Sequence, residues 1–315
     1  MVFSMRTNGK LLLTGEYFVT EGAVALTLPT RLGQKIEVKA SDVKEAVLNW
    51  KSYTKDEEIW FEANFNLADL ALQSIDGGSD KEAVANTLQN ILKQAQQMNP
   101  SFLSSSDALD VKCQLEFDRN WGLGSSSTLI TMIARWAAID PFELLHKTFG
   151  GSGYDIVAAT AEGPTLFQKF NGNNRWEPSG FNPVFKHQLY FVYLGKKQNT
   201  REAVVHYMIT APEDREKPLP RITQITHDIA QYTNNLADFD ALLEEHESLV
   251  QSIIKQPKAK EVYFSDYWGA VKSLGGWGGD FVLVTSDKSY EETAAYFNKK
   301  GFDTLLSYED LIKVN

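Results

Sequence analysis

The stretch from Phe117 to Thr131, FDRNWGLGSSSTLIT, constrains the fold of this chain more than any other. An alternating apolar segment leads into two glycines, three serines follow, and apolar residues then recur at helical spacing. This order predicts a strand, a tight turn at Gly122 and Gly124, and a helix that begins at the serines. Glycine takes backbone angles that other residues avoid, and it lets the backbone approach a ligand closely.

A turn of this kind is suited to phosphate. The first N–H groups of a helix have no partner within the helix, and the positive end of the helix dipole attracts anions. The serine hydroxyls add donors, and one of them can instead bind a Mg²⁺ ion held by a nucleotide. The loop is neither a Walker A motif nor the dinucleotide G-x-G-x-x-G pattern. Taken alone, it is slightly better explained as a serine-capped helix after a glycine turn, which is a very common structure.

Length and composition restrict the class of protein. At 315 residues the chain favours two domains, and 43% hydrophobic with 23% charged residues is ordinary for a globular protein. The N-terminal MVFSMRTNGK lacks the apolar run of a signal peptide, and the single cysteine, Cys113, cannot form an internal disulfide. We therefore expect a cytoplasmic protein. A net charge of −10 argues against binding to nucleic acid or to an anionic membrane.

Alternating and helical patterns predict an α+β protein in two lobes, residues 1–185 and 186–315. In the first lobe we expect the strands KLLLT, AVALTL, QKIEVKA, AVLNWKS and EIWFEANF, a helix over 80–98, and a strand over 109–117. Asp140, Pro141 and Glu143 have the spacing of an N-cap, a first-turn proline and a capping-box acid. The turn GSGYD, 151–155, precedes a further helix.

We expect residues 164–170 and 186–194 to pair as strands across the turn FNGNNR. Helices are predicted over 201–208 and about 221–253. The chain then closes with the glycine-rich KSLGGWGGD, the strand FVLVT, a helix over 289–300 and a strand near 302–306.

Three segments, in this order, resemble the GHMP kinases. They are GKLLLTGEYFVTEGAVAL at 9–26, WGLGSSSTL at 121–129 and KSLGGWGGDF at 272–281, and GSGYD lies where the family has its catalytic aspartate. The resemblance implies a nucleotide-binding N-terminal lobe and a ferredoxin-like C-terminal lobe, with ATP and substrate meeting between them. It also implies transfer of the γ-phosphoryl group of Mg-ATP to an alcohol or a phosphate.

Within that family, the triplet Gly15-Glu16-Tyr17 resembles the isoprenoid-pathway members, phosphomevalonate kinase most and mevalonate kinase next. The expected acceptor is therefore phosphomevalonate or mevalonate. Homoserine kinase, a sugar kinase and diphosphomevalonate decarboxylase are alternatives within the same superfamily. We expect a small-molecule enzyme, a monomer or a homodimer, that uses ATP and Mg²⁺ and does not bind nucleic acid or membrane.

The resemblance implies that Asp155 is the catalytic acid/base or orients the acceptor hydroxyl, and that Lys10 pairs with it and with the transferred phosphoryl group. From the residues alone, Asp155 could equally be a helix N-cap and Lys10 a solvated surface residue. The loop residues that would hold phosphate are Gly122, Leu123, Gly124, Ser125, Ser126, Ser127 and Thr128.

For the metal, Ser126 is the expected Mg²⁺ ligand. Glu16 and Glu143 compete as the carboxylate, and Glu143 is assigned to the metal, although the capping-box spacing from Asp140 explains it without one. The residues expected to contact the acceptor are Glu16, Tyr17, Ser152, Gly153, Lys197, Thr200, Arg201, Gly275 and Gly276.

The run from Lys196 to Arg201 could be simply a polar loop. However, Lys10, Lys196, Lys197, Arg201 and Lys272 all fall in or beside the family segments of an acidic chain. This local positive charge favours an acceptor that carries a carboxylate or a phosphate.

Three positions depart from the family pattern, because Asp118 stands where a proline is common, Leu274 where a serine is usual and Trp277 where a glycine is usual. Leu274, Trp277 and the position of Glu143, about one residue away from the family glutamate, motivate a second hypothesis, a catalytically weak nucleotide-binding regulatory protein. The histidines show no paired zinc spacing and are expected to be packing or surface residues; they are His146, His187, His206, His227 and His246.

Overall fold

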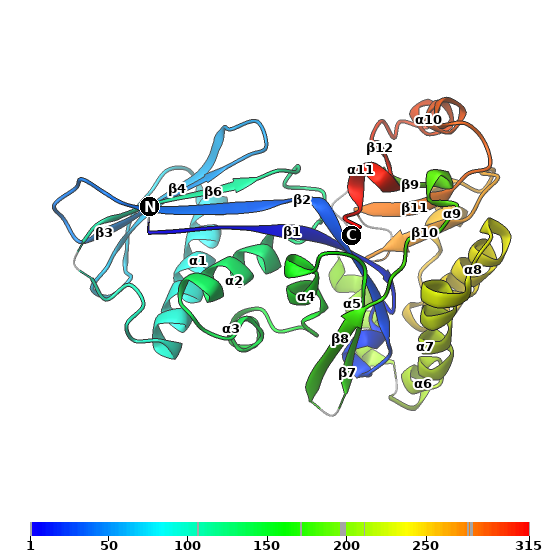
Figure 1. Ribbon diagram of the computed structural model, residues 1–315, viewed down its shortest axis with the longest axis horizontal. Coiled ribbons are helices and arrows are strands. Elements are labelled where there is room, and N and C mark those ends of the chain that lie inside the picture. The colour runs from blue at the N-terminus through cyan, green and yellow to red at the C-terminus, as the bar shows by residue number, and fades with distance from the viewer. Residues whose placement is uncertain are drawn as a thin grey trace. The chain divides into compact units, whose positions relative to one another are not determined.

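The computed structural model of the chain (Figure 1) describes residues 2–105, 107–170, 172–195, 200–210, 212–275, 277 and 280–314, with the backbone alone for 200–204. The chain divides into two compact units. Unit 1 comprises Met1–Gly9, Leu32–Arg119 and Leu123–Thr160, and unit 2 comprises Lys10–Arg31, Asn120–Gly122 and Ala161–Asn315. The predicted lobe boundary at residue 185 stays a prediction.

Unit 1 is a sheet covered by helices. Its strands lie in the order β5-β4-β3-β6-β2, with β1 also paired to β2. The neighbours β3 and β6 run parallel, and the pairs β5–β4, β4–β3 and β6–β2 are antiparallel. The strands are β1 (Phe3–Thr14), β2 (Ala25–Ala40), β3 (Val47–Tyr53), β4 (Ile59–Asn66), β5 (Leu72–Ile75) and β6 (Leu109–Leu115). The first residues of β1 and the later residues of β2 belong to this unit.

Apolar and polar residues alternate along the strands, so one face of this sheet is apolar and is covered by helices. On β3, Leu48 and Trp50 are buried while Asn49 and Lys51 are only partly covered. The buried side chains meet the apolar faces of α1 (Ser79–Met98), α2 (Ser125–Trp136), α3 (Pro141–Thr148) and α4 (Tyr154–Thr160) in one core. In Figure 1, α1, α2 and α3 lie on one side of the sheet.

Unit 2 contains the start of β2, which pairs with β7 (Thr165–Phe170). The strand β7 in turn forms a hairpin with β8 (Asn173–Pro178). A separate antiparallel sheet has the order β10-β11-β9-β12. Its strands are β9 (Leu189–Tyr193), β10 (Val271–Leu274), β11 (Phe281–Thr285) and β12 (Leu305–Ser307). Helices follow the first and third of these strands, so the arrangement is the predicted ferredoxin-like one.

The helical elements of unit 2 pack on these sheets. They are η1 (Phe18–Glu21), η2 (Lys186–Gln188), α5 (Thr200–Ile209), α6 (Pro212–Glu216), α7 (Leu219–His227), the π-helical turn η3 (Asp228–Tyr232), α8 (Leu236–Ile254), α9 (Ala259–Tyr263), α10 (Tyr290–Lys299) and α11 (Tyr308–Leu311). One apolar core lies under β9–β11 and α10, and another joins η1, α7 and α8. Within the described ranges, no helix has the length and apolarity needed to span a bilayer.

Two strand predictions were wrong. The segments AVALTL and QKIEVKA form one strand, β2, because the intervening Pro29–Gly33 stays extended. Neighbours hold it in place, since Thr30 bridges to Ile312, and a Cβ at Gly33 would lie 1.9 Å from the carbonyl oxygen of Thr7. The partner of β7 is also not 186–194 but the polar strand β8, which the short turn at Gly172 brings directly alongside.

Candidate functional site

The glycine loop has the predicted strand, turn and helix. Gly122 and Gly124 both have positive φ, 64° and 87°, and Gly124 is the N-cap of α2. The first backbone bond of the helix runs from the N–H of Thr128 to the carbonyl of Gly124, at 3.0 Å. The N–H groups of Ser125, Ser126 and Ser127 therefore have no partner within the helix and form a potential anion site.

The hydroxyls of the loop divide into two sets. Ser127 and Thr128 are buried; the Ser127 hydroxyl donates to Gly124 O at 2.9 Å, and the Thr128 hydroxyl donates to Ser125 O at 2.9 Å and contacts Gln34 Oε1. Ser126 is exposed and Ser125 half-buried. Ser127 and Thr128 therefore stabilise the turn, whereas Ser125 and Ser126 can offer their hydroxyls to a ligand.

Lys10 and Asp280 lie at the first glycine of the loop, in the same unit. Lys10 Nζ donates to the carbonyl of Gly122 at 3.2 Å, and a Cβ on Gly122 would lie 1.7 Å from Asp280 Oδ2. Glycine is required at this position both by its positive φ and by this close approach. Asp280 belongs to KSLGGWGGDF, so this segment and the start of the loop meet within unit 2.

Asp155 lies inside the first turn of α4, at the end of the second glycine turn. The N–H groups of Ile156 and Val157 both donate to the carbonyl of Gly153, which has φ 93°. Helical hydrogen bonding therefore begins at Gly153, and the Asp155 carboxylate accepts the N–H of Ile156 at 3.1 Å. Ser152 is buried beside it.

Glu143 shows no metal-site geometry among the described residues. Its carboxylate is 57% exposed and lies 3.7 Å from Lys147 Nζ, one turn along α3. The predicted N-cap and first-turn proline are confirmed, since Asp140 Oδ1 accepts the N–H of Phe142 at 2.8 Å and Pro141 opens the helix. Across the described chain, no three His, Cys, Asp or Glu side chains are grouped to hold a metal ion. Magnesium bound with a nucleotide needs only one or two protein oxygens, which the exposed Ser126 hydroxyl fits.

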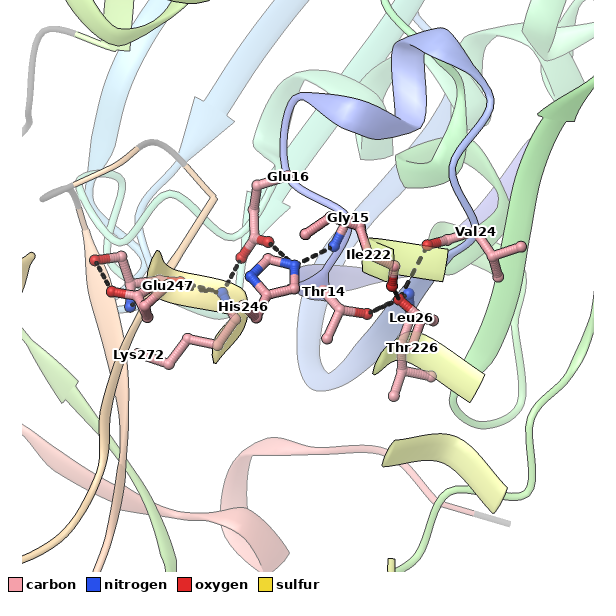
Figure 2. A network of polar contacts seen from close by, with 11 residues as sticks. Thr14, Gly15, Glu16, Val24, Leu26, Ile222, Thr226, His246, Glu247 and Lys272 are labelled. Atoms are coloured by element: carbon pink, nitrogen blue, oxygen red, sulfur yellow. Dashed lines mark hydrogen bonds and ion pairs between the residues drawn. The ribbon is translucent and has the colours of Figure 1, made fainter. Parts of the chain in front are cut away.

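The carboxylate of Glu16 lies in a buried polar network of unit 2 (Figure 2). Lys272 Nζ is 2.6 Å from Glu16 Oε1 and 3.6 Å from Glu247 Oε1, and all three side chains are at most 4% exposed. Lys272 also donates to Ser273 O at 3.0 Å. The sequence-based inclusion of Lys272 among cations that face an acceptor is therefore wrong in this structure, because its charge is buried against Glu16.

Burial determines the protonation of this network. Desolvation raises the pKa of Glu247 to about 8 and raises the pKa of Glu16, although Lys272 opposes both shifts. Desolvation and the Lys272 charge hold the pKa of His246 well below its usual value. His246 is thus neutral, and its Nε2 accepts the N–H of Gly15 at 2.9 Å.

Tyr17 and Trp277 connect the Gly15-Glu16-Tyr17 triplet to the C-terminal glycine segment. The backbone N–H of Trp277 donates to the Tyr17 hydroxyl at 3.1 Å, and its indole N–H donates to Pro257 O at 2.8 Å. Trp277 is buried, as is Leu274 at the end of β10, and Gly275 follows with φ 71°. The indole therefore packs inside unit 2.

Several predicted contacts fall outside what the structure describes. Lys197 and Gly276 lie outside the described residues, and so do the side chains of Thr200 and Arg201, whose backbone begins α5.

Sequence analysis missed His246 and Glu247 as partners of the triplet. The sequence did contain a signal. His246 and Glu247 lie at helical spacing from Phe239, Leu243 and Val250, so they share the face of α8 that packs in the core. Polar residues at core positions of an amphipathic helix must find partners there.

Comparisons with protein-family models and with curated protein sequences find no match. Solved structures do match along nearly the whole chain. Mevalonate kinase from Methanococcus jannaschii is 17% identical with a TM-score of 0.69, and the match covers 99% of this chain and 98% of that one.

Phosphomevalonate kinase from Streptococcus pneumoniae, solved with phosphomevalonate and AMPPNP, is 15% identical with a TM-score of 0.63 over 97% and 99% of the two chains. Galactokinase from Lactococcus lactis, solved with galactose, is 11% identical with a TM-score of 0.65 over 99% and 95%. The chain therefore has the α+β fold of the GHMP kinases, as its sequence motifs predicted.

Proposed function

We propose that this protein is an ATP-dependent small-molecule kinase that transfers the γ-phosphoryl group of Mg-ATP to an anionic acceptor, phosphomevalonate in first place and mevalonate in second. The observation that carries the proposal is the glycine loop before α2, whose first-turn N–H groups have no partner within the helix, in a chain with the fold of these kinases. Phosphoryl transfer depends mainly on positioning and on charge stabilisation, which such a loop supplies.

In this proposal the N–H groups of Ser125, Ser126 and Ser127 donate to phosphate oxygens. Gly122 and Gly124 give the turn its positive φ, and Leu123, which is buried, anchors it. The exposed Ser126 hydroxyl is the protein ligand to Mg²⁺. Bound Mg-ATP would supply the phosphoryl group and neutralise part of its charge.

Asp155 orients the attacking group of the acceptor, and accepts its proton if that group is a hydroxyl. Its position in the first turn of α4, after three glycines with positive φ at 150, 151 and 153, gives the carboxylate a defined direction. Lys10, which donates to the carbonyl of Gly122, holds the loop and stabilises negative charge on the transferred group.

For the acceptor we propose contacts from Tyr17, Ser152, Gly153 and Gly275 and from the cationic run at Lys197–Arg201. Glu16 contributes to this site through the backbone conformation of its turn, because its carboxylate is already paired with Lys272. Charge-assisted hydrogen bonds to lysine and arginine favour an acceptor that carries a carboxylate or a phosphate.

A second candidate, a nucleotide-binding regulatory protein with little activity, is favoured by one observation. Leu274 and Trp277, which replace a serine and a glycine of the family motif, are both buried in unit 2. A leucine side chain cannot donate to a phosphate, so this segment has one donor fewer than the motif provides.

Nucleotide binding and turnover, measured in parallel on the purified protein, test the proposal. The turnover screen would offer mevalonate, phosphomevalonate, diphosphomevalonate, homoserine and galactose with Mg-ATP. We expect ATP binding together with phosphoryl transfer to a mevalonate-type acceptor. Binding without transfer to any acceptor would support the regulatory candidate, and ATP-dependent release of CO₂ from diphosphomevalonate would support the decarboxylase.

A further inference from the structure

The backbone at Tyr17 has an unusual conformation. The N–H of Phe18 donates to the carbonyl of Glu16 at 2.8 Å, and Tyr17 between them has φ 65° and ψ −51°. This is a γ-turn with positive φ at its centre, which is rare and strained, above all for an aromatic residue. Strain of this kind persists only where surrounding contacts hold the turn in place, and it is concentrated at functional sites.

His246 supplies the contact that holds the entrance to this turn. Its Nε2 accepts the N–H of Gly15 at 2.9 Å, and the imidazole is fully buried on α8 (Figure 2). Gly15 has φ 86°, and a Cβ there would lie 2.8 Å from the Cβ of Ala25. Its carbonyl accepts the N–H of Val19 at 2.9 Å, so both backbone groups of Gly15 are engaged.

The other contacts of residues 14–16 with distant parts of the chain are made by side chains. The hydroxyls of Thr14 and Thr226 are 2.8 Å apart, and Lys272 binds the carboxylate of Glu16. The bond from Gly15 to His246 joins the backbone directly before the γ-turn to α8, whereas the bond from Val19 to the Gly15 carbonyl is local. Figure 2 shows the imidazole placed between the Glu16 carboxylate and the backbone nitrogen of Gly15.

The γ-turn determines where the Tyr17 side chain lies. Its ring stacks on Tyr207 with 5.5 Å between the centroids, and its hydroxyl accepts the N–H of Trp277. A hydroxyl that accepts one bond can still donate its proton, and no acceptor for that proton is found among the described residues. The ring is only half-buried, so a ligand can reach it.

We propose that His246 is a positioning residue of this site: by accepting the N–H of Gly15 it holds the γ-turn, and it thereby places the Tyr17 hydroxyl to donate to an anionic group of the acceptor. This inference rests on the proposed kinase function for its ligand. His246 itself does not touch the acceptor. Its effect is transmitted through the backbone of residues 15–17.

Two substitutions of His246 separate positioning from packing. His246→Gln keeps an acceptor oxygen near the place of Nε2, whereas His246→Leu fills similar space without an acceptor. Phe297→Leu, in the other core of unit 2, is the matched stability control. We expect His246→Leu to raise the KM of the acceptor about tenfold, the effect of losing one hydrogen bond, with the KM of ATP unchanged. The Gln variant and the control should keep both constants.

Tyr17→Phe provides a second arm if His246→Leu does not fold. By itself it should raise the acceptor KM to a similar extent. Where His246→Leu does fold, adding it to Tyr17→Phe should raise the KM no further, since both act through one hydroxyl. Multiplying effects, or an equal rise in the KM of ATP, would overturn the positioning role.

Hydrogen exchange of the ligand-free proteins tests, without any substrate, whether His246 stabilises the γ-turn. Amides of residues 15–19 should exchange faster in His246→Leu than in wild type, His246→Gln or Phe297→Leu. Equal exchange in all four proteins would overturn the inference. Absence of turnover in the wild type would instead remove the proposed function, and the exchange result would still decide whether His246 holds the turn.

Discussion

Asp155 and Asp140 show how one residue type has two roles in this chain. Asp140 lies just before α3 and its carboxylate caps the helix by accepting the N–H of Phe142. Asp155 lies inside the first turn of α4, where helical hydrogen bonding begins at the carbonyl of Gly153 instead. An aspartate that is not needed as an N-cap is better suited to a role in chemistry.

This difference gives the first prediction. Asp155→Asn should leave folding and ATP binding intact and lower turnover about a hundredfold or more, because asparagine cannot act as an acid or base. Asp140→Asn is the matched control, since asparagine caps helices as well as aspartate does. Turnover of purified variants and the ATP-induced shift in Tm are the measurements. Equal turnover in the two variants would remove Asp155 from the mechanism.

The second residue-scale prediction concerns Glu247 and pH. Its pKa is raised from 4.5 to about 8 in the folded protein, so between these values the unfolded chain releases a proton that the folded protein keeps. The contribution of Glu247 to stability is therefore complete below pH 4.5 and is lost as the pH rises through about 8.

Glu247→Gln removes this titration while its side-chain oxygen can still accept the N–H of Ser273, which lies 3.2 Å from Glu247 Oε1. The Tm of the variant minus that of the wild type should increase as the pH is raised from about 5 to about 8. A constant difference over this range would mean that Glu247 titrates normally.

At the scale of elements, the proposed function makes the glycine loop and α2 act together as one anion site. The positive φ of Gly124 turns the chain so that the first N–H groups of α2 point away from the helix toward a ligand. A β-branched residue strains this conformation and obstructs the approach of a phosphate.

We therefore predict that saturating Mg-ATP raises the Tm of the wild type and not that of Gly124→Val. Ligand at about a hundred times its Kd stabilises the native state by about 2.7 kcal/mol. Gly301→Ala is the control, because Gly301 also has positive φ, 85°, and has open space around it in unit 2. It should lower the Tm and keep the ATP-induced increase. A full ATP effect in folded Gly124→Val would place the phosphate site elsewhere.

At the scale of the whole molecule, charge restricts the choice of acceptor. The chain carries a net charge of −10, so an anionic acceptor needs local cations to overcome the general repulsion. Lys272 does not provide one, because it is buried against Glu16. This leaves Lys10 and the run from Lys196 to Arg201 as the candidate cations.

We predict that kcat/KM is highest for phosphomevalonate, then mevalonate, and lowest for homoserine and galactose. Lys197→Ala and Arg201→Ala should each lower the value for the preferred acceptor about tenfold or more, the scale of a lost charge-assisted bond. Lys217→Ala changes the net charge equally at an exposed side chain that pairs with Asp214, and should have little effect. Best activity on an uncharged sugar would contradict the acceptor assignment and leave the kinase proposal standing.

Sequence by itself determined the elements whose causes are local. Glycine spacing and helical periodicity predicted the turn at Gly122–Gly124, α2, and the cap of α3 at Asp140, and the ordered motifs predicted the fold. Each of these depends on backbone angles and hydrogen bonds within a few residues. Only the tertiary structure decided the continuity of β2 and the partners of the Gly15-Glu16-Tyr17 triplet. Lys272 is 256 residues from Glu16 and His246 is 231 from Gly15, so no local pattern pairs them. They meet because polar groups buried by the packing of α8 and β10 must satisfy one another.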